Sequence, residues 1–211
     1  MCCRYYMEMN PELRPIVEEM NRAPLAVKMR EKLGKPLTSE GEVRPTDIVP
    51  AIASAPSGTA KVYPMLWGFS ARGADRPIVN ARVETAPRKP LWKEAWAKHR
   101  CIIPASWYFE WEHLISPSGK PKTGDRYLIQ PRGLEVCYMA GLYRLEEFRD
   151  LKYPVFAILT RAPSPELSWI HDHMPVILPA ERIDEWIRPE GDAGEIVKAA
   201  VTDMVFEKAV Q

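Results

Sequence analysis

The chain has 211 residues, of which 46% are hydrophobic, and its formal net charge at pH 7 is +1. This size and apolar fraction predict a single domain over residues 1–211 with a substantial core. The balanced charge excludes a protein that attracts polyanions through its overall field. No apolar run approaches the ~20 residues that span a bilayer, and the polar N-terminus is not a signal peptide, so we expect a cytoplasmic protein without membrane contact.

The four cysteines are Cys2, Cys3, Cys101 and Cys137. They contain no C-x-x-C pair, which argues against a zinc site. The sequence also has no Gly-rich phosphate loop, no nucleophile elbow and no H-E-x-x-H signature. We therefore expect no metal and no cofactor, and we expect reduced thiols.

The first third of the chain predicts helices followed by short strands. After an extended start at 5–7, Asn10-Pro11 is typical of a helix N-terminus, and apolar residues then recur at helical spacing through Met20. A weaker helical pattern resumes over 27–33 and ends at Gly34. An apolar segment at 48–53 and an aromatic-rich strand at 62–69 follow.

The remainder of the chain favours strands joined by turns. We expect extended segments at 78–85, 101–111, 126–130, 135–143, 153–160 and 174–178. A polar loop is expected at 116–125, and short helices are expected at 92–98, 181–186 and 192–201. This order predicts an α+β fold with a curved, barrel-like, mostly antiparallel sheet flanked by short helices.

The N-terminal stretch Met1-Cys2-Cys3-Arg4 carries the first candidate for chemistry. If Met1 is removed, Cys2 presents an α-amine and a thiol on adjacent carbons, with ordinary pKa values near ~8 and ~8.5. The amine of such an aminothiol condenses with an aldehyde to an imine, and the thiolate then closes a five-membered thiazolidine. An ordinary residue at a frayed terminus is the alternative interpretation.

Three further polar residues have apolar neighbours in the sequence. Asn80 interrupts a strand-like segment, where a buried amide needs hydrogen bonds. Glu110 lies among aromatic residues, where lost hydration raises the pKa of a carboxyl and suits it to proton transfer. His171 titrates near neutral pH and can shuttle protons. The alternatives are that Asn80 is a bulge or turn residue, that the Glu110 carboxylate faces solvent, and that His171 is a hydrogen-bonded loop histidine.

Residues 72–100 form a locally basic strip, with eight Lys or Arg residues against three acids. Such a strip can bind phosphates, although a solvated surface is the more common explanation. Trp67, Phe69 and Trp107 are candidates for stacking on unpaired bases. Core packing is the more common role of such aromatic residues.

Taken in order along the chain, these motifs resemble the SOS-response-associated peptidase family, the SRAP domain. The matching segments are Met1-Cys2 with Arg4, Leu66-Trp67-Gly68-Phe69, Asn80-Ala81-Arg82-Val83-Glu84-Thr85, residues 101–105, Trp107-Tyr108-Phe109-Glu110-Trp111 and residues 170–178. They span nearly the whole chain.

The resemblance implies a sensor of abasic sites in single-stranded DNA that crosslinks covalently through Cys2. It implies that Asn80 orients the terminus and the opened sugar, that Glu110 moves protons during ring opening and imine formation, and that His171 assists proton transfer. It also implies self-cleavage that exposes Cys2, lyase character, a role in the SOS response and association with the nucleoid. We expect a monomer. The DNA contacts implied by the resemblance are Arg4, Trp67, Gly68, Arg82, Glu84 and Trp107.

Two positions depart from the family pattern, and two other functions stay open. Cys3 stands where the family usually has glycine, and it adds a second thiol that can compete for oxidation. His173 stands where the family often has arginine, which makes an anion contact pH-dependent. The other functions are a cysteine-nucleophile peptidase or amidase with the terminal amine as base, and a non-catalytic single-strand DNA binder whose association is reversed by salt.

Overall fold

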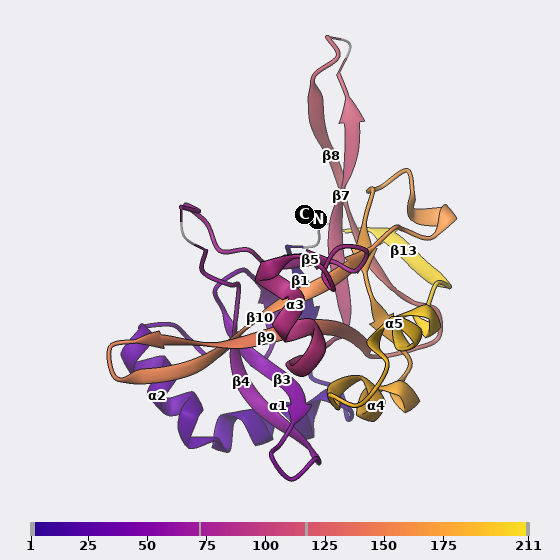
Figure 1. Ribbon diagram of the computed structural model, residues 1–211. Helices are drawn as coiled ribbons and strands as arrows, with labels where there is room; N and C mark the ends of the chain where they lie inside the picture. The colour runs from indigo at the N-terminus through magenta and orange to yellow at the C-terminus, as the bar shows by residue number, and fades with distance from the viewer. Residues whose placement is uncertain (1–2, 72, 117, 210–211) are drawn as a thin grey trace.

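The computed structural model describes residues 3–71, 73–116 and 118–209 (Figure 1). One sheet has five strands in the order β13-β8-β7-β1-β2, and the other has the order β11-β10-β4-β3-β6-β9-β12. Strand β9 also pairs with β10, so β10, β4, β3, β6 and β9 close a five-stranded barrel. Within this barrel only β10 and β4 are parallel. The predicted α+β class and barrel-like sheet are confirmed.

The bounds of the elements are as follows. The strands are β1 (Tyr5–Met7), β2 (Gly41–Val43), β3 (Ile48–Ser54), β4 (Ala60–Trp67), β5 (Asn80–Arg82), β6 (Arg100–Ala105), β7 (Trp107–Ile115), β8 (Pro121–Pro131), β9 (Cys137–Phe148), β10 (Leu151–Arg161), β11 (Met174–Pro175), β12 (Ile177–Leu178) and β13 (Met204–Lys208). The α-helices are α1 (Leu13–Arg22), α2 (Pro24–Leu33), α3 (Pro90–Lys98), α4 (Ile183–Ile187) and α5 (Ala193–Ile196). The 3₁₀ turns are η1 (Pro165–Leu167), η2 (Ala180–Arg182) and η3 (Val197–Ala199).

The two N-terminal helices follow their sequence signals. The side chain of Asn10 accepts hydrogen bonds from the backbone N–H groups of Glu12 and Leu13, at 3.0 and 2.8 Å, so it caps the first turn. Leu13 then begins a helix that buries its apolar stripe against the barrel. The second helix ends at Gly34, whose φ of 63° lies in the left-handed region that favours glycine.

The extended stretch at 101–111 contains a change of sheet. Strand β6 belongs to the barrel and β7 to the five-stranded sheet, and Ser106 lies between them. The N–H of Ser106 donates to the carbonyl of Tyr6 at 2.8 Å, and its Oγ accepts from the N–H of Glu8 at 2.9 Å. These two bonds hold the corner against the N-terminal strand, which brings β1 and β7 together.

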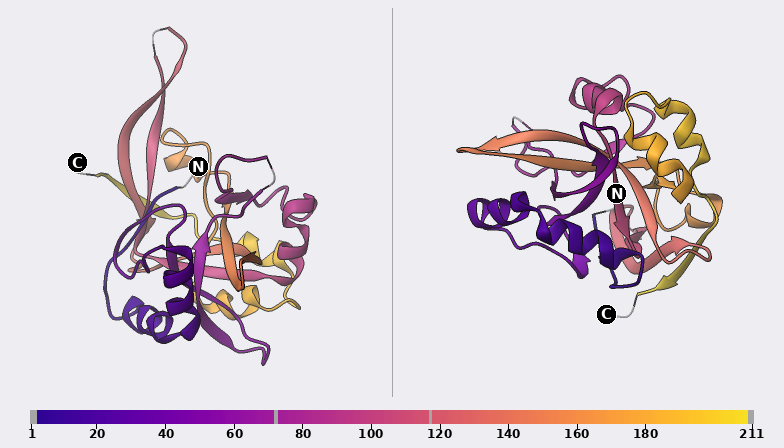
Figure 2. Two further views of the ribbon diagram at one scale, coloured as in Figure 1. Left: turned by 90° about the vertical axis from the view of Figure 1, so that its left-hand side faces the viewer. Right: turned by 90° about the horizontal axis from the view of Figure 1, so that it is seen from below.

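Three other expectations differ from the structure. The segment 116–125 was expected to be a hairpin loop, and β7 and β8 do form a hairpin, which stands out from the body (Figure 2), but β8 already begins at Pro121. The helix expected over 192–201 is only α5 followed by η3. Strand β13 was not expected. Among the described residues, no helix is both long and apolar enough to span a bilayer.

Arg100 links the barrel to the C-terminal helices. Its side chain is 2% exposed, and Nε donates to the carbonyl of Trp186 at 2.6 Å. The other guanidinium nitrogens donate to the carbonyls of Trp96, Arg188 and Gly191. A buried cation is tolerated where several acceptors replace its water.

We expect Arg100→Met to lower the free energy of unfolding by about 3 kcal/mol, because it leaves several buried carbonyls without a donor. Urea denaturation measures this loss. Arg132→Met is the matched control, because Arg132 pairs with Asp203 at an exposed site, and its removal changes stability by less than about 1 kcal/mol. Equal midpoints for the two variants would contradict the structural role of Arg100.

Candidate active site

Glu110 is a buried carboxyl in the middle of β7. Glu110 is 3% exposed, and burial raises the pKa of its carboxyl to about 7. Alternation along the strand puts Tyr108 and Glu110 on the face that looks into the core, and Trp107, Phe109 and Trp111 on the other. The prediction of a desolvated carboxyl with a raised pKa is confirmed, and the alternative of a solvent-facing Glu110 is wrong.

His171 lies against this carboxyl. It is 4% exposed, and its Nε2 is 3.9 Å from Oε2 of Glu110. Burial lowers the pKa of His171 to about 4, and the ring of His113, 4.0 Å away between centroids, contributes in the same direction. The imidazole is therefore neutral at pH 7, next to a carboxyl that is protonated in part of the molecules. One group can donate a proton and the other can accept one.

The second nitrogen of His171 is also occupied. Its Nδ1 accepts the backbone N–H of His173 at 3.0 Å, which places the proton of the neutral ring on Nε2, toward Glu110. Oδ1 of Asp172 lies 3.0 Å from the same Nδ1. When the imidazole takes up a proton, this exposed carboxylate is a ready partner for it.

Core packing fixes the loop that carries His171. Leu167 and Ile170 are buried, and the carbonyl of Ile170 accepts the N–H of His113 at 3.0 Å. The loop is thus attached both to the core and to β7, the strand that carries Glu110.

The N-terminal strand runs beside Glu110. Strand β1 is antiparallel to β7, with Tyr5 opposite Tyr108 and Tyr6 opposite Trp107. The N–H of Phe109 donates to the carbonyl of Arg4 at 2.9 Å, and one further step of this register puts Cys3 opposite Glu110. Burial raises the pKa of the Cys3 thiol, and the charge of Glu110 raises it further. Cys2, the predicted nucleophile, lies outside the described residues.

Asn80 begins β5 and is 8% exposed. It lies opposite Ile158 in the parallel pairing with β10. The preceding carbonyl, that of Val79, accepts the indole N–H of Trp67 at 3.0 Å. Asn80 is therefore held in the same wall of the core that contains Trp67, and the strand around it is shorter than the expected 78–85.

Two of the predicted DNA contacts are buried. Trp67 is fully buried and packs on Tyr5 and Phe156, so it presents no exposed ring face to a base. Gly68 has a φ of 127°, and a Cβ there would lie 2.7 Å from Cβ of Pro77. This position requires glycine for its backbone conformation and for the close approach of the neighbouring loop.

The other predicted DNA contacts lie nearer the surface. Arg82 and Glu84 are exposed at the end of β5 and in the turn after it. Trp107 is partly buried and stacks on Tyr6, with ring centroids 4.6 Å apart. Arg4 forms an ion pair with Glu42 at 3.0 Å. The strand alternation places Trp107 on the face of the sheet opposite Glu110.

His113 was not singled out from the sequence. It lies three residues after Glu110 on β7, and its ring is 4.0 Å from that of His171 between centroids. His113, His171 and Asp172 place potential ligand atoms within 4.8 Å of one another. This group is where a transition-metal ion would find nitrogen and oxygen donors.

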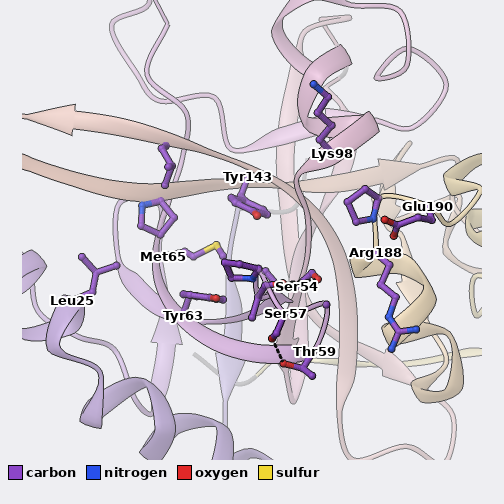
Figure 3. A pocket seen from close by; sticks show the side chains of 17 residues that line it. Leu25, Ser54, Ser57, Thr59, Tyr63, Met65, Lys98, Tyr143, Arg188 and Glu190 are labelled. Atoms are coloured by element: carbon purple, nitrogen blue, oxygen red, sulfur yellow. Dashed lines mark hydrogen bonds between the residues drawn. The ribbon is translucent and has the colours of Figure 1, made fainter.

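A groove of about 880 Å³ lies elsewhere on the molecule (Figure 3). The β3–β4 turn with Ser57 and Thr59, the rings of Tyr63 and Tyr143 and the side chain of Arg188 contribute to its walls. Asn80, Glu110 and His171 do not line it. These three candidate residues therefore lie outside this groove.

Curated proteins with detectable sequence similarity are named abasic site processing proteins. YobE of Bacillus subtilis is 36% identical over 116 residues, which are 54% of this chain and 50% of that protein. YedK of Escherichia coli is 31% identical over 146 residues, which are 67% of this chain and 62% of that protein. The matched part is about half the length of the first of these relatives.

Solved structures share the fold. A protein from Bacteroides thetaiotaomicron superposes with a TM-score of 0.75 at 21% identity, covering 100% of this chain and 93% of that one. A phage-related protein from Bordetella bronchiseptica gives a TM-score of 0.70 at 23% identity, with 100% and 95% covered. The SOS response associated peptidase (SRAP) family matches residues 1–209. With this match over nearly its whole length, the chain belongs to the SRAP family.

Proposed function

We propose that this protein captures abasic sites in single-stranded DNA through Cys2, after Met1 has been removed. The observation that carries the proposal is a buried carboxyl with a pKa of about 7 beside the strand that leads from the N-terminus. Cys3 is the first residue of the chain that the structure describes, and the charge of Glu110 raises the pKa of its thiol. Cys2 is its neighbour in the sequence. Membership of the SRAP family and the names of the relatives support the substrate class.

The proposed chemistry is aldehyde capture. An abasic sugar equilibrates with a ring-opened aldehyde, and protonated Glu110 assists this opening by donating to the ring oxygen. The α-amine of Cys2 adds to the aldehyde carbon, water leaves and an imine forms. The thiolate then adds to the imine carbon and closes a thiazolidine. One C–N bond and one C–S bond form, one water is released, and no oxidant is needed.

The neighbouring residues complete the site. His171, neutral and with the Nε2–H directed toward Glu110, returns a proton to the Glu110 carboxylate and regains one at Nδ1, beside Asp172. Asn80 orients the terminus and the opened sugar, while exposed Arg82 contacts phosphate. Closure of the thiazolidine removes the imine that promotes β-elimination, so strand cleavage is a side reaction. Unpaired DNA is favoured because it bends into such a site at low cost.

We expect processed wild-type protein to form a covalent adduct with a single-stranded oligonucleotide that contains one abasic site. Intact-mass spectrometry under denaturing conditions should show protein plus DNA minus one water, without borohydride. The same measurement on the free protein establishes that its first residue is Cys2.

Cys2→Ala should abolish this adduct, whereas Cys3→Ala is the matched control and should retain it, since an internal thiol has no adjacent free amine. An adduct that survives in Cys2→Ala would contradict capture at the terminus. The absence of any adduct from protein that starts at Cys2 would remove the proposal.

The pH profile tests the role of Glu110. As the pH rises through about 7, this carboxyl loses the proton that makes it an acid. We expect Glu110→Gln to slow adduct formation about 10²-fold or more below pH 7. The ratio of wild-type to variant rates should then fall about tenfold per pH unit above pH 7. Single-turnover rates between pH 5.5 and 9 measure this ratio.

Glu112→Gln is the control for a carboxyl two residues further along β7, and its rates should follow those of the wild type. If the ratio for Glu110→Gln does not change with pH, Glu110 is not the general acid.

A further inference from the structure

Three aromatic rings gather on the inner face of the five-stranded sheet, beyond the core. They belong to Tyr127 of β8, Phe206 of β13 and Trp169 of the loop before His171. Tyr127 is 5.1 Å from Trp169 and 6.1 Å from Phe206 between ring centroids, and Trp169 is 5.6 Å from Phe206. Trp169 is 45% exposed and Phe206 is 39% exposed, so together they form an apolar surface open to solvent.

This aromatic cluster is continuous with the candidate active site. Tyr127 lies directly opposite Glu110 in the β7–β8 register, so both side chains point to the same face of the sheet. Trp169 precedes His171 by two residues in the anchored loop. A ligand that reaches Glu110 and His171 along this face therefore passes over the aromatic cluster.

The geometry of the rings suits a flat ligand. All three pairs meet edge to face, with interplanar angles of 82°, 76° and 70°, so the rings do not cover one another's faces as parallel stacking would. Lys208 lies opposite Tyr127 on β13 and is 63% exposed, where it pairs with Asp125. Its ammonium group lies beside the rings and can attract a phosphate of the nucleic-acid backbone.

We propose that Trp169, supported by Tyr127 and Phe206, stacks on the unpaired base next to the abasic nucleotide. This inference rests on the proposed function, and it identifies how the substrate is positioned. An abasic nucleotide has no base of its own, so its neighbour must supply the stacking energy that holds the sugar at Glu110. A base within a duplex already has both faces covered, and the same surface therefore selects single strands.

The test uses single-stranded DNA with a tetrahydrofuran abasic analogue, which has no aldehyde and cannot crosslink. A 2-aminopurine base is placed on the 5′ side of the analogue in one oligonucleotide and on the 3′ side in another. We expect wild-type protein to quench the fluorescence of one of these probes through stacking. Trp169→Ala should lose this quenching and bind about 5- to 150-fold more weakly.

Trp169→Phe should retain most of the quenching, because a smaller ring still stacks, and circular dichroism confirms that each variant is folded. Phe148→Ala is the matched control, since Phe148 is 43% exposed on the distant β9–β10 hairpin, and it should behave like the wild type. Replacing the 2-aminopurine neighbour with a second tetrahydrofuran should weaken wild-type binding but not that of Trp169→Ala.

Equal quenching and affinity in the wild type and Trp169→Ala would overturn the proposal. So would concentration-dependent dimerisation of the wild type that Trp169→Ala abolishes, because the aromatic cluster would then be a contact between copies. The failures of the two proposals are distinct. Aldehyde-bearing DNA that forms no adduct refutes capture by Cys2, whereas the tetrahydrofuran probe reports stacking whether or not capture occurs.

Discussion

Desolvation of the Glu110 carboxyl is the constraint on which the site depends. The same sheet carries a second acid, Glu42, on its opposite face, where it pairs with Arg4, Arg44 and Arg126. Partial burial alone would raise the pKa of Glu42, but Arg126 and the other guanidinium groups lower it. Glu110 lies 3.9 Å from the neutral ring of His171, and burial raises its pKa to about 7. Two carboxyls on opposite faces of one sheet thus have pKa values shifted in opposite directions.

Such tuning requires a rigid surround, because water that enters the site restores the ordinary pKa. Strand β7 lies between β1 and β8, and both neighbours are hydrogen-bonded to it around Glu110. The His171 loop closes the remaining side, with Ile170 buried and bonded to β7 through His113. The low pKa of His171 has the same origin, since the same burial disfavours its cation. The pKa shifts of Glu110 and His171 therefore have the same main cause, which is burial.

Local sequence patterns singled out Glu110 and His171 as candidates but did not predict their arrangement. The aromatic flanks of Glu110 indicated a desolvated carboxyl, yet alternation alone does not say which face of β7 is inside. The long-range pairing of Tyr5 with Tyr108 decides this. His113 escaped prediction because its contact with His171 joins β7 to a loop far along the chain, and no local pattern indicates that contact. The barrel was predicted from the number and spacing of the strands, whereas the parallel contact of β10 with β4 joins segments too distant for any local pattern.

The thiol of Cys3 has a raised pKa, which makes it a weaker competitor for an aldehyde than an ordinary thiol. Burial and the nearby carboxylate keep its pKa above the ordinary value, so less thiolate is present at neutral pH. An internal cysteine also lacks a free amine, and its addition to an aldehyde stops at a thiohemiacetal that reverts readily. The ionised form of Glu110 disfavours the Cys3 thiolate, so the proposed acid also weakens the competing nucleophile above pH 7. In the proposed reaction the two adjacent thiols differ in two ways, because only Cys2 has a free amine and the Cys3 thiol has a raised pKa. Selectivity for Cys2 therefore does not require glycine at the third position.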